Sequence, residues 1–470
     1  MTRTAPDATA STAGRRPVRA AWLTLAMGGS AVANYAYSLL LTYGLAPADY
    51  AVFAAGNGVL LVLGTFGAVA VPWVLAREIV VQAAHPDRQR AAVNLAFWIN
   101  VGAGAVLAGA VAAVTLTFGS PPTALVMAAT TFLLAVGSTA LGYLQGTQRV
   151  TLLGFVLLGE FAVKLGSGVV LVFVLDLGAT ASLLAGTLGA LVPFAACLTC
   201  LRAIGRPRRV RLSHGLWQAA GRIGSVQIVV ALFTALDTVL VAALAATRAG
   251  AGPYQAAAAL GRAPLFVSVA VSTAVFPALL AHRGDHRRRA DALWTLAVVS
   301  VVAVIAMASV PAAAVELVFP AEFGALAGWL PVVTLGGAGV GMLNMLTTFL
   351  QTEDRIRAAQ AILAAGFVLH AALLVAGAQY AGLSGLAWGG VIGVWCTVAL
   401  LAALPTERAA VAALARRVAT PRVALVLAAL AAVLVVVDHP VAWLACAVVA
   451  AVGACLVAFP ELATRIRPAA

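Results

Sequence analysis

The side chains of this sequence that are suited to chemistry are a few charged groups inside long apolar stretches. Asp237 and Arg262 lie in successive stretches, each about nine residues, or roughly 13 Å, from the same expected end. An ionisable group at such depth in a membrane is costly and usually faces protein or a water-filled cavity. Opposite charges at one depth on adjacent antiparallel helices predict an ion pair, which either joins the helices or takes part in binding a charged ligand.

A second pair, Glu160 and Lys164, has i, i+4 spacing within one stretch, which places both on one helical face in the orientation that favours pairing. The residue 206 positions after Lys164 is His370. If both basic groups face a cavity, they would receive an anionic ligand from two sides. The alternative is a Glu160–Lys164 pair that satisfies itself and an unrelated core histidine.

Two asparagines, Asn34 and Asn57, fall at a similar depth in the first half of the chain, and Asn57 precedes Arg262 by 205 positions. They indicate either a polar layer inside the membrane or hydrogen bonds between helices. Cys197 and Cys200 form a CxxC pair in an apolar stretch with no His or second cysteine pair nearby, which favours packing over metal or redox chemistry. No metal site and no cofactor are expected.

The stretches that carry these residues predict an all-α polytopic membrane protein. The chain is 63% hydrophobic and 10% charged, whereas soluble globular chains have about 25% charged residues. A hydrocarbon core of roughly 30 Å needs about 20 apolar residues per helix. We expect about 14 such helices, at residues 21–43, 51–75, 92–118, 122–145, 150–175, 179–201, 216–246, 253–281, 292–318, 325–350, 356–378, 383–404, 422–437 and 440–459.

The basic residues alternate between the connections of these helices. The N-terminal tail and every second connection carry arginines, whereas the connections between them carry only Arg248. Because basic loops stay on the cytoplasmic side, the pattern predicts that both ends lie inside, in a multi-pass protein of the inner (cytoplasmic) membrane. The net charge of +13 then favours anionic membrane lipids as partners, and no nucleic acid is expected.

An internal repeat divides the chain. Leu144-Gln145 followed by Arg149 recurs as Leu350-Gln351 followed by Arg355, 206 positions later. Six spans return the chain to its starting side, so the two six-helix repeats are predicted to be parallel, with two helices added at the C-terminus. The expected parts are a disordered cytoplasmic tail (1–20), an N-lobe (21–201), a basic linker (202–215), a C-lobe (216–404), helices 13 and 14 (422–459) and a cytoplasmic tail (460–470).

Parallel repeats of this kind are typical of transporters, in which one lobe rocks against the other around a cavity. The connections expected outside are only a few residues long and hold no catalytic constellation, and no Walker sequence is present. We therefore expect a transporter that is not an enzyme and does not itself hydrolyse ATP.

Several segments resemble the bacterial polysaccharide flippases of the multidrug/oligosaccharidyl-lipid/polysaccharide exporter superfamily. Residues 45–53 (LAPADYAVF), followed by a Gly-rich helix that ends in Leu-Ala-Arg-Glu at 75–78, resemble their first helical hairpin. Residues 237–241 (DTVLV), with Gly-Pro-Tyr at 252–254 and Val-Phe-Pro at 275–277, resemble the opening of their second half. Residues 381–387 (AGLSGLA) resemble the turn into their helix 12, so the resemblance spans residues 21–460.

The resemblance implies two lobes around a cavity and alternating access. The implied substrate is a polyprenyl-diphosphate-linked oligosaccharide, moved from the inner to the outer leaflet for surface polysaccharide biosynthesis, with a polysaccharide polymerase and glycosyltransferases as protein partners. Helices 13 and 14 would accommodate the lipid tail. By analogy Arg262, supported by Lys164 or His370, would engage the diphosphate. Helix 1 has no arginine after Arg19, unlike the peptidoglycan-precursor flippases, which argues against that substrate.

The competing hypothesis is a cation-coupled multidrug antiporter of the same superfamily. Such proteins often need a membrane carboxylate that binds a proton or Na⁺. Here helix 1 has no acidic residue, and Asp237 and Glu160 each have a basic neighbour in the sequence pattern. These features favour the flippase.

Overall fold

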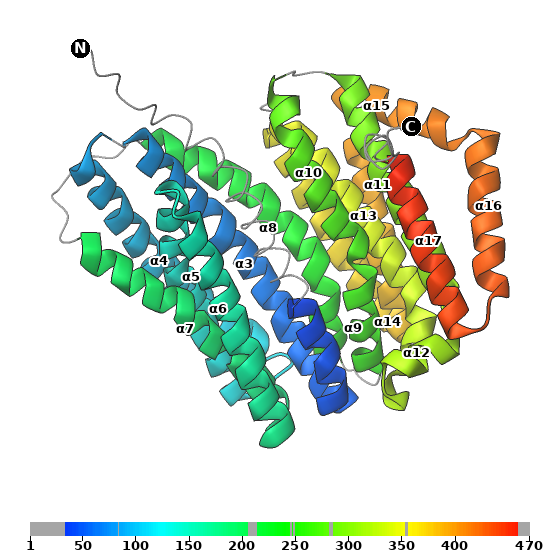
Figure 1. Ribbon diagram of the computed structural model, residues 1–470, viewed down its shortest axis with the longest axis horizontal. Coiled ribbons are helices and arrows are strands. Elements are labelled where there is room, and N and C mark those ends of the chain that lie inside the picture. The colour runs from blue at the N-terminus through cyan, green and yellow to red at the C-terminus, as the bar shows by residue number, and fades with distance from the viewer. Residues whose placement is uncertain are drawn as a thin grey trace, which may run out of the picture. The chain divides into compact units, whose positions relative to one another are not determined.

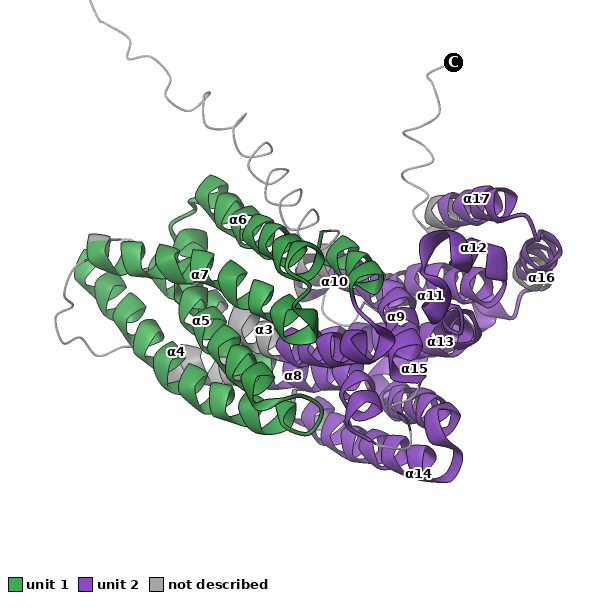
Figure 2. Ribbon diagram, turned by 90° about the horizontal axis from the view of Figure 1, so that it is seen from below, with its two compact units in different colours: residues 1–44, 63–224 green, residues 45–62, 225–470 purple. Residues whose placement is uncertain are grey.

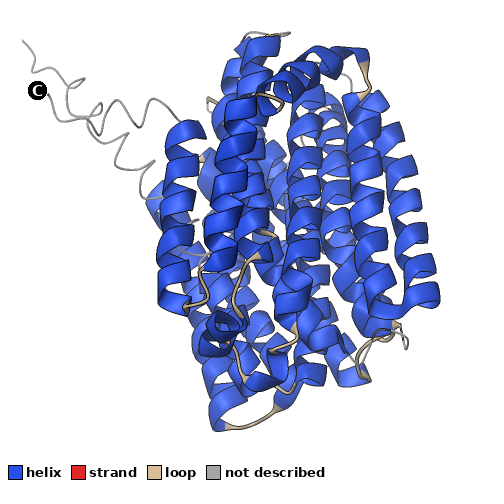
Figure 3. Cartoon of the chain, turned by 90° about the vertical axis from the view of Figure 1, so that its right-hand side faces the viewer, coloured by secondary structure: helices blue, strands red, loops and turns tan. Residues whose placement is uncertain are grey.

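Helices account for all regular structure in the part of the chain that the computed structural model describes, residues 33–82, 84–204, 214–244, 247, 250–281, 285–352 and 356–458 (Figure 3). Residues 33–44 are helical and precede the labelled elements. The helices are α3 (Pro47–Val81), α4 (Pro86–Thr115), α5 (Pro121–Gly146), α6 (Val150–Val169) with a π turn (Val170–Val174), α7 (Gly178–Ile204), α8 (His214–Ala243), α9 (Ala251–Gly261), α10 (Ala263–Ala281), α11 (His286–Ala308), α12 (Ala312–Val318), a 3₁₀ turn (Ala321–Phe323), α13 (Leu326–Thr352), α14 (Ile356–Ala402), α15 (Pro405–Val418), α16 (Pro421–Val436) and α17 (Pro440–Ala458) (Figure 1).

The predicted class, an all-α polytopic membrane protein, is confirmed. Within the described ranges, nine helices are long and apolar enough to cross a membrane, and three shorter apolar helices accompany them. Every predicted span overlaps a helix, although the first is described only from residue 33. The number of crossings and the cytoplasmic placement of both ends stay predictions. The predicted tails, residues 1–20 and 460–470, lie outside the described residues, as do 205–213 of the expected linker.

Two of the expected spans are each divided into two helices. The segment 253–281 breaks at Arg262, between α9 and α10. Pro264 follows the break, and proline lacks the N–H of a helix interior and disfavours helical backbone in the residue before it. The segment 292–318 breaks where α11 ends at Ala308 and Pro311 precedes α12. In both places a proline in the sequence explains the break in the helix.

The connection between spans 12 and 13, which was expected to be a loop, contains the helix α15 at residues 405–418. Its first residue is Pro405, which is well suited to the first turn because its missing N–H has no intrahelical partner there. The spans predicted at 356–378 and 383–404 are the two halves of α14 and meet at a kink. Gly382 has φ 58° at this kink, a left-handed conformation that glycine adopts without a side-chain penalty.

The chain forms two compact units (Figure 2). The first unit holds the residues up to 44 together with 63–224, and the second holds 45–62 together with the residues from 225 onward. The helix α3 is therefore shared, and its first half packs with the second unit, where the Tyr50 ring meets the Phe323 ring edge-on at 5.3 Å. The boundaries of the predicted lobes, 21–201 and 216–404, stay a prediction.

Small residues bring the helices of the first unit into close contact. A Cβ on Gly142 would lie 2.7 Å from the backbone of Pro72, and one on Gly137 would lie 2.9 Å from the backbone of Phe194. Short polar side chains add bonds between the same helices, since the Asn100 amide donates to Ser138 Oγ (3.1 Å) and Thr139 Oγ1 (2.8 Å). Such contacts hold membrane helices together because lipid provides no hydrophobic drive between them.

The second unit has a larger apolar core, built from α8, α10, α11, α13 and α14. Leu293, Leu346, Phe349 and Leu363 are fully buried in it. The backbone of Gly337 on α13 lies directly against the carbonyl of Gly261, at the break between α9 and α10. This close approach leaves no room for a side chain and positions Arg262 beside α13 and α8.

Candidate functional site

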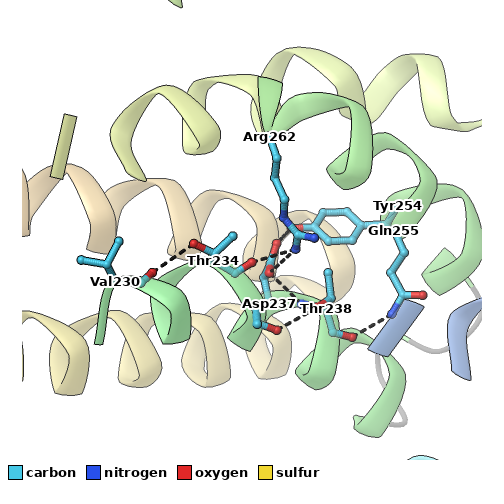
Figure 4. Close-up of polar contacts among 8 residues, drawn as sticks. Val230, Thr234, Asp237, Thr238, Tyr254, Gln255 and Arg262 are labelled. Atoms are coloured by element: carbon cyan, nitrogen blue, oxygen red, sulfur yellow. Dashed lines mark hydrogen bonds and ion pairs between the residues drawn. The ribbon is translucent and has the colours of Figure 1, made fainter. Parts of the chain in front are cut away.

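The predicted ion pair between Asp237 and Arg262 is present in the second unit (Figure 4). Asp237 lies on α8, and Arg262 lies in the break between α9 and α10. Arg262 Nη2 is 3.5 Å from Asp237 Oδ1 and donates a shorter bond of 2.7 Å to the backbone carbonyl of Thr234. The two charged side chains are 19% and 21% exposed, so the pair is mostly shielded but still reachable.

The Asp237 carboxylate has two further donors besides the guanidinium. The Thr238 N–H donates to Oδ1 (2.8 Å), and the Tyr254 hydroxyl donates to Oδ2 (3.2 Å). Tyr254 is held in turn by an edge-on contact with the Trp329 ring at 5.8 Å. Because the carboxylate is hydrogen-bonded without Arg262, loss of the guanidinium would not leave Asp237 without partners.

Tyr254 was not among the expected site residues. The signal was available in the sequence, because Tyr254 and Arg262 are eight residues apart and so lie on one face of a helix. Its neighbour Gln255 donates to the backbone carbonyl of Thr238 (2.7 Å), which ties α9 to α8 beside the ion pair. The start of α9 therefore helps to orient the acidic residue.

His370, on α14, faces the same pocket. Its side chain is 2% exposed and its ring lies 4.8 Å from the Phe233 ring. Gly393 in the second half of α14 packs directly on it, since a Cβ there would lie 2.6 Å from His370 Cα. In the described part of the chain the ring nitrogens form no hydrogen bond of normal geometry, and the Gly390 backbone is a weak partner beside the ring. A buried polar group so weakly satisfied suits a site that receives a polar ligand or water.

The pocket that contains these groups is small, with a cavity volume of about 50 Å³, and it is partly open. Its polar lining comes from Thr234, Asp237, Tyr254, Arg262 and His370, on α8, α9, α14 and the α9–α10 break. The remaining lining is mostly apolar and is contributed largely by α13 and the second half of α14. A few converging polar groups in an apolar concavity are the usual features of a small-molecule site.

Glu160 and Lys164 interact electrostatically, but no direct ion pair joins them among the described residues. Lys164 Nζ donates instead to Asn34 Oδ1 (2.9 Å), on the helix of residues 33–44. The ammonium also lies 5.3 Å from the centre of the Tyr37 ring, whose hydroxyl donates to the backbone carbonyl of Ser182 (3.0 Å). Among the described residues no ion pair joins Lys164 to an acidic group, because the side chain turns toward another helix and not along its own.

Asn34 and Asn57 belong to different units. Asn34 is the partner of Lys164 in the first unit, whereas Asn57 lies on the part of α3 that packs with the second unit. Its neighbour Gly58 contacts α8, because a Cβ there would lie 2.6 Å from Thr238 Oγ1. The structure thus brings Asn57 near the helix that carries Asp237, and the side chain itself is half-buried.

No protein-family model matches the sequence, and no curated protein is similar to it at a significant level. Solved structures are similar in fold. The lipid II flippase MurJ, in an inward closed conformation, has a TM-score of 0.70 at 12% identity and covers 94% of this chain and 99% of its own. An inward-facing multidrug resistance MATE family transporter of the MOP superfamily has a TM-score of 0.63 at 13% identity, covering 83% of this chain and 96% of its own.

The chain has the fold of these transporters. Its likeness to the MurJ structure covers nearly the whole chain, whereas the MATE structure covers a smaller share of it. The break at Arg262, the kink at Gly382 and the helix α15 are thus details of a chain whose overall path is that of a polytopic transporter fold.

Proposed function

We propose that this chain is a transporter that moves a polyprenyl-diphosphate-linked oligosaccharide from the cytoplasmic to the outer leaflet by alternating access, for surface polysaccharide biosynthesis. The observation that carries the proposal is the pocket that combines Arg262 with the buried His370. A diphosphate is anionic, and a guanidinium binds phosphate oxygens through two parallel hydrogen bonds.

The geometry of the ion pair suits exchange between a resting and a bound state. Arg262 holds Asp237 through a single 3.5 Å contact and not through a bidentate one. The carboxylate retains its bonds from Thr238 and Tyr254 when the guanidinium leaves. Arg262 can therefore transfer to a phosphate group at a modest cost, and His370 supplies a further nitrogen donor to the same ligand.

Lys164 is the corresponding basic residue of the first unit in this proposal. Its partners, Asn34 and the Tyr37 ring, are neutral, so its charge is not cancelled by a contacting acid among the described residues. The proposed substrate path also includes the polar side chains of Asn57 in the second unit and Glu160 in the first unit. The MurJ structure, which has a similar fold, is that of a lipid II flippase, and this likeness is consistent with a lipid-linked substrate.

The second candidate is a cation-coupled multidrug antiporter, which the fold of the MATE structures favours equally. In that case Asp237, in a pocket with the aromatic rings of Phe233 and Tyr254, would bind the coupling cation or a cationic drug. The bound Arg262 guanidinium argues against it, since a second cation would have to displace the first.

Export of surface glycan in cells that depend on this chain tests the proposal. Arg262→Ala should abolish export, while membrane insertion, measured as the amount of protein in washed membranes, stays normal. Arg357→Ala is the matched control, because Arg357 is an exposed arginine of the same unit outside the pocket, and export should be unchanged.

Full export by an Arg262→Ala/His370→Ala double variant would overturn the site assignment. The antiporter alternative makes a separate prediction. Overexpression would confer resistance to cationic drugs, and Asp237→Asn would remove that resistance.

A further inference from the structure

The helix α15 is a short helix that connects two apolar helices. It follows α14, which ends at Ala402, and precedes α16, which begins at Pro421, with two residues at each junction (Figure 1). Its 14 residues extend for about 21 Å at 1.5 Å per residue. Because α14 is long and apolar enough to span a membrane and α16 is a shorter apolar helix, the amphipathic α15 between them is expected at the edge of the apolar layer.

One face of α15 packs against the interior of the second unit. Glu407 and Ala410 are fully buried, and Val411 and Leu414 pack against the apolar core. Glu407 Oε1 accepts a 3.0 Å bond from Arg289 Nη1 on α11, and the side chains of this ion pair are 0% and 1% exposed. Breaking one member of such a buried pair is strongly unfavourable, so the pair prevents α15 from rolling about its axis.

The opposite face of α15 carries two exposed arginines, Arg408 and Arg416, two helical turns apart. The exposed residues between them on this face are the alanines at 409, 412 and 415. The Nε–H groups of the two arginines donate only to nearby backbone carbonyls, of Ala403 (2.7 Å) and Ala412 (3.3 Å). Within the described residues, the terminal N–H groups of the two guanidinium groups form no hydrogen bond.

Acidic residues nearby are occupied by other arginines. Asp291 pairs with Arg417 (2.7 Å), and Asp285 pairs with Arg288 (3.1 Å). Within the ranges that the structure describes, Arg408 and Arg416 form no ion pair with an acid. Arg408 and Arg416, attached about 12 Å apart along the helix axis, thus present two uncompensated guanidinium groups beside an alanine surface that headgroups could approach closely.

We propose that the outer face of α15, defined by Arg408 and Arg416, binds the phosphate groups of anionic phospholipids. Guanidinium groups suit phosphate because they donate parallel hydrogen bonds to two oxygens. A basic side chain near an anionic leaflet strengthens binding about fivefold. The site is independent of the transport pocket, and its occupant is a lipid headgroup of the surrounding leaflet.

The test uses the full chain purified in detergent and titrated with phosphatidylglycerol or phosphatidylcholine, with bound lipid counted by native mass spectrometry. The unmodified chain should prefer phosphatidylglycerol. The Arg408→Gln/Arg416→Gln variant should bind it on the order of 25-fold more weakly, whereas Arg408→Lys/Arg416→Lys should keep most of the preference because the charge remains.

The matched control is Arg77→Gln/Arg202→Gln, which removes two exposed arginines of the first unit. Its preference for phosphatidylglycerol should stay within about twofold of the unmodified chain, since neither residue belongs to α15. An unchanged preference in the Arg408→Gln/Arg416→Gln variant would overturn the proposal. An equal loss in the control would do the same, because binding would then reflect total charge and not the face of α15.

Discussion

The two units hold a basic side chain inside a membrane protein in different ways. In the first unit Lys164 donates to a neutral amide, Asn34, and lies over the Tyr37 ring. In the second unit Arg262 contacts a carboxylate, Asp237. A cation with neutral partners keeps its net charge, whereas an ion pair cancels it. The difference teaches that the Lys164 ammonium has no carboxylate in direct contact, with Glu160 as an electrostatic neighbour on its own helix, whereas the Arg262 guanidinium is released only when its contact with Asp237 opens.

The largest loss of stability should come from Asp237→Asn. This change replaces the carboxylate partner of Arg262 by a neutral amide, which is the kind of partner that Lys164 has in the first unit. The change leaves Arg262 without its counter-charge, and breaking a shielded pair from one side costs roughly 3 kcal/mol of unfolding free energy. The measurement is denaturant or thermal unfolding of the purified protein in detergent. The Asp237→Asn/Arg262→Gln variant should recover most of the loss, and a double variant less stable than the single one would contradict this interpretation.

A smaller difference is expected in the first unit, where Asn34→Ala should be more destabilising than Lys164→Met. Removing the amide leaves the ammonium without its hydrogen bond and should cost about 2 kcal/mol. Replacing the lysine loses that bond and the contact with the Tyr37 ring but also removes a buried charge, so the net change should stay within about 1 kcal/mol. The same unfolding measurement decides it, and the reverse order would show that Lys164 is paired by more than Asn34 and Tyr37.

The smallest effects should come from two tyrosine hydroxyls, one in each unit. Tyr254→Phe removes a donor from Asp237, and Tyr37→Phe removes one from the Ser182 carbonyl; each should cost about 1 kcal/mol. Combining each variant with Asp237→Asn distinguishes the two tyrosines. Changes in unfolding free energy are non-additive for residues that share a contact and additive for residues that do not. Tyr254→Phe should then be non-additive and Tyr37→Phe additive, and equal additivity would contradict the assigned bond.

Much of the fold was predictable because lipid imposes a simple rule on the sequence. Spans must be long and apolar, so the segments 122–145 and 179–201 are found within a few residues of α5 and α7. Pro264 was expected to disturb its helix, but a complete break there and at Pro311 was not predicted, since a proline is compatible with a bent helix as well as with a broken one. The helix α15 was missed because a short amphipathic segment gains its stability from tertiary packing, here of Glu407 and Ala410.

The sequence by itself determined that the chain is a helical membrane protein and that Asp237 and Arg262 form a pair. Both conclusions follow from depth and hydrophobicity, which are properties of position along a helix. Only the tertiary structure decided that Lys164 bonds to Asn34 and not to Glu160, and that Tyr254 and His370 share the pocket of Arg262. The physical reason is that helical spacing defines which residues share a face, whereas the groups opposite that face belong to other helices.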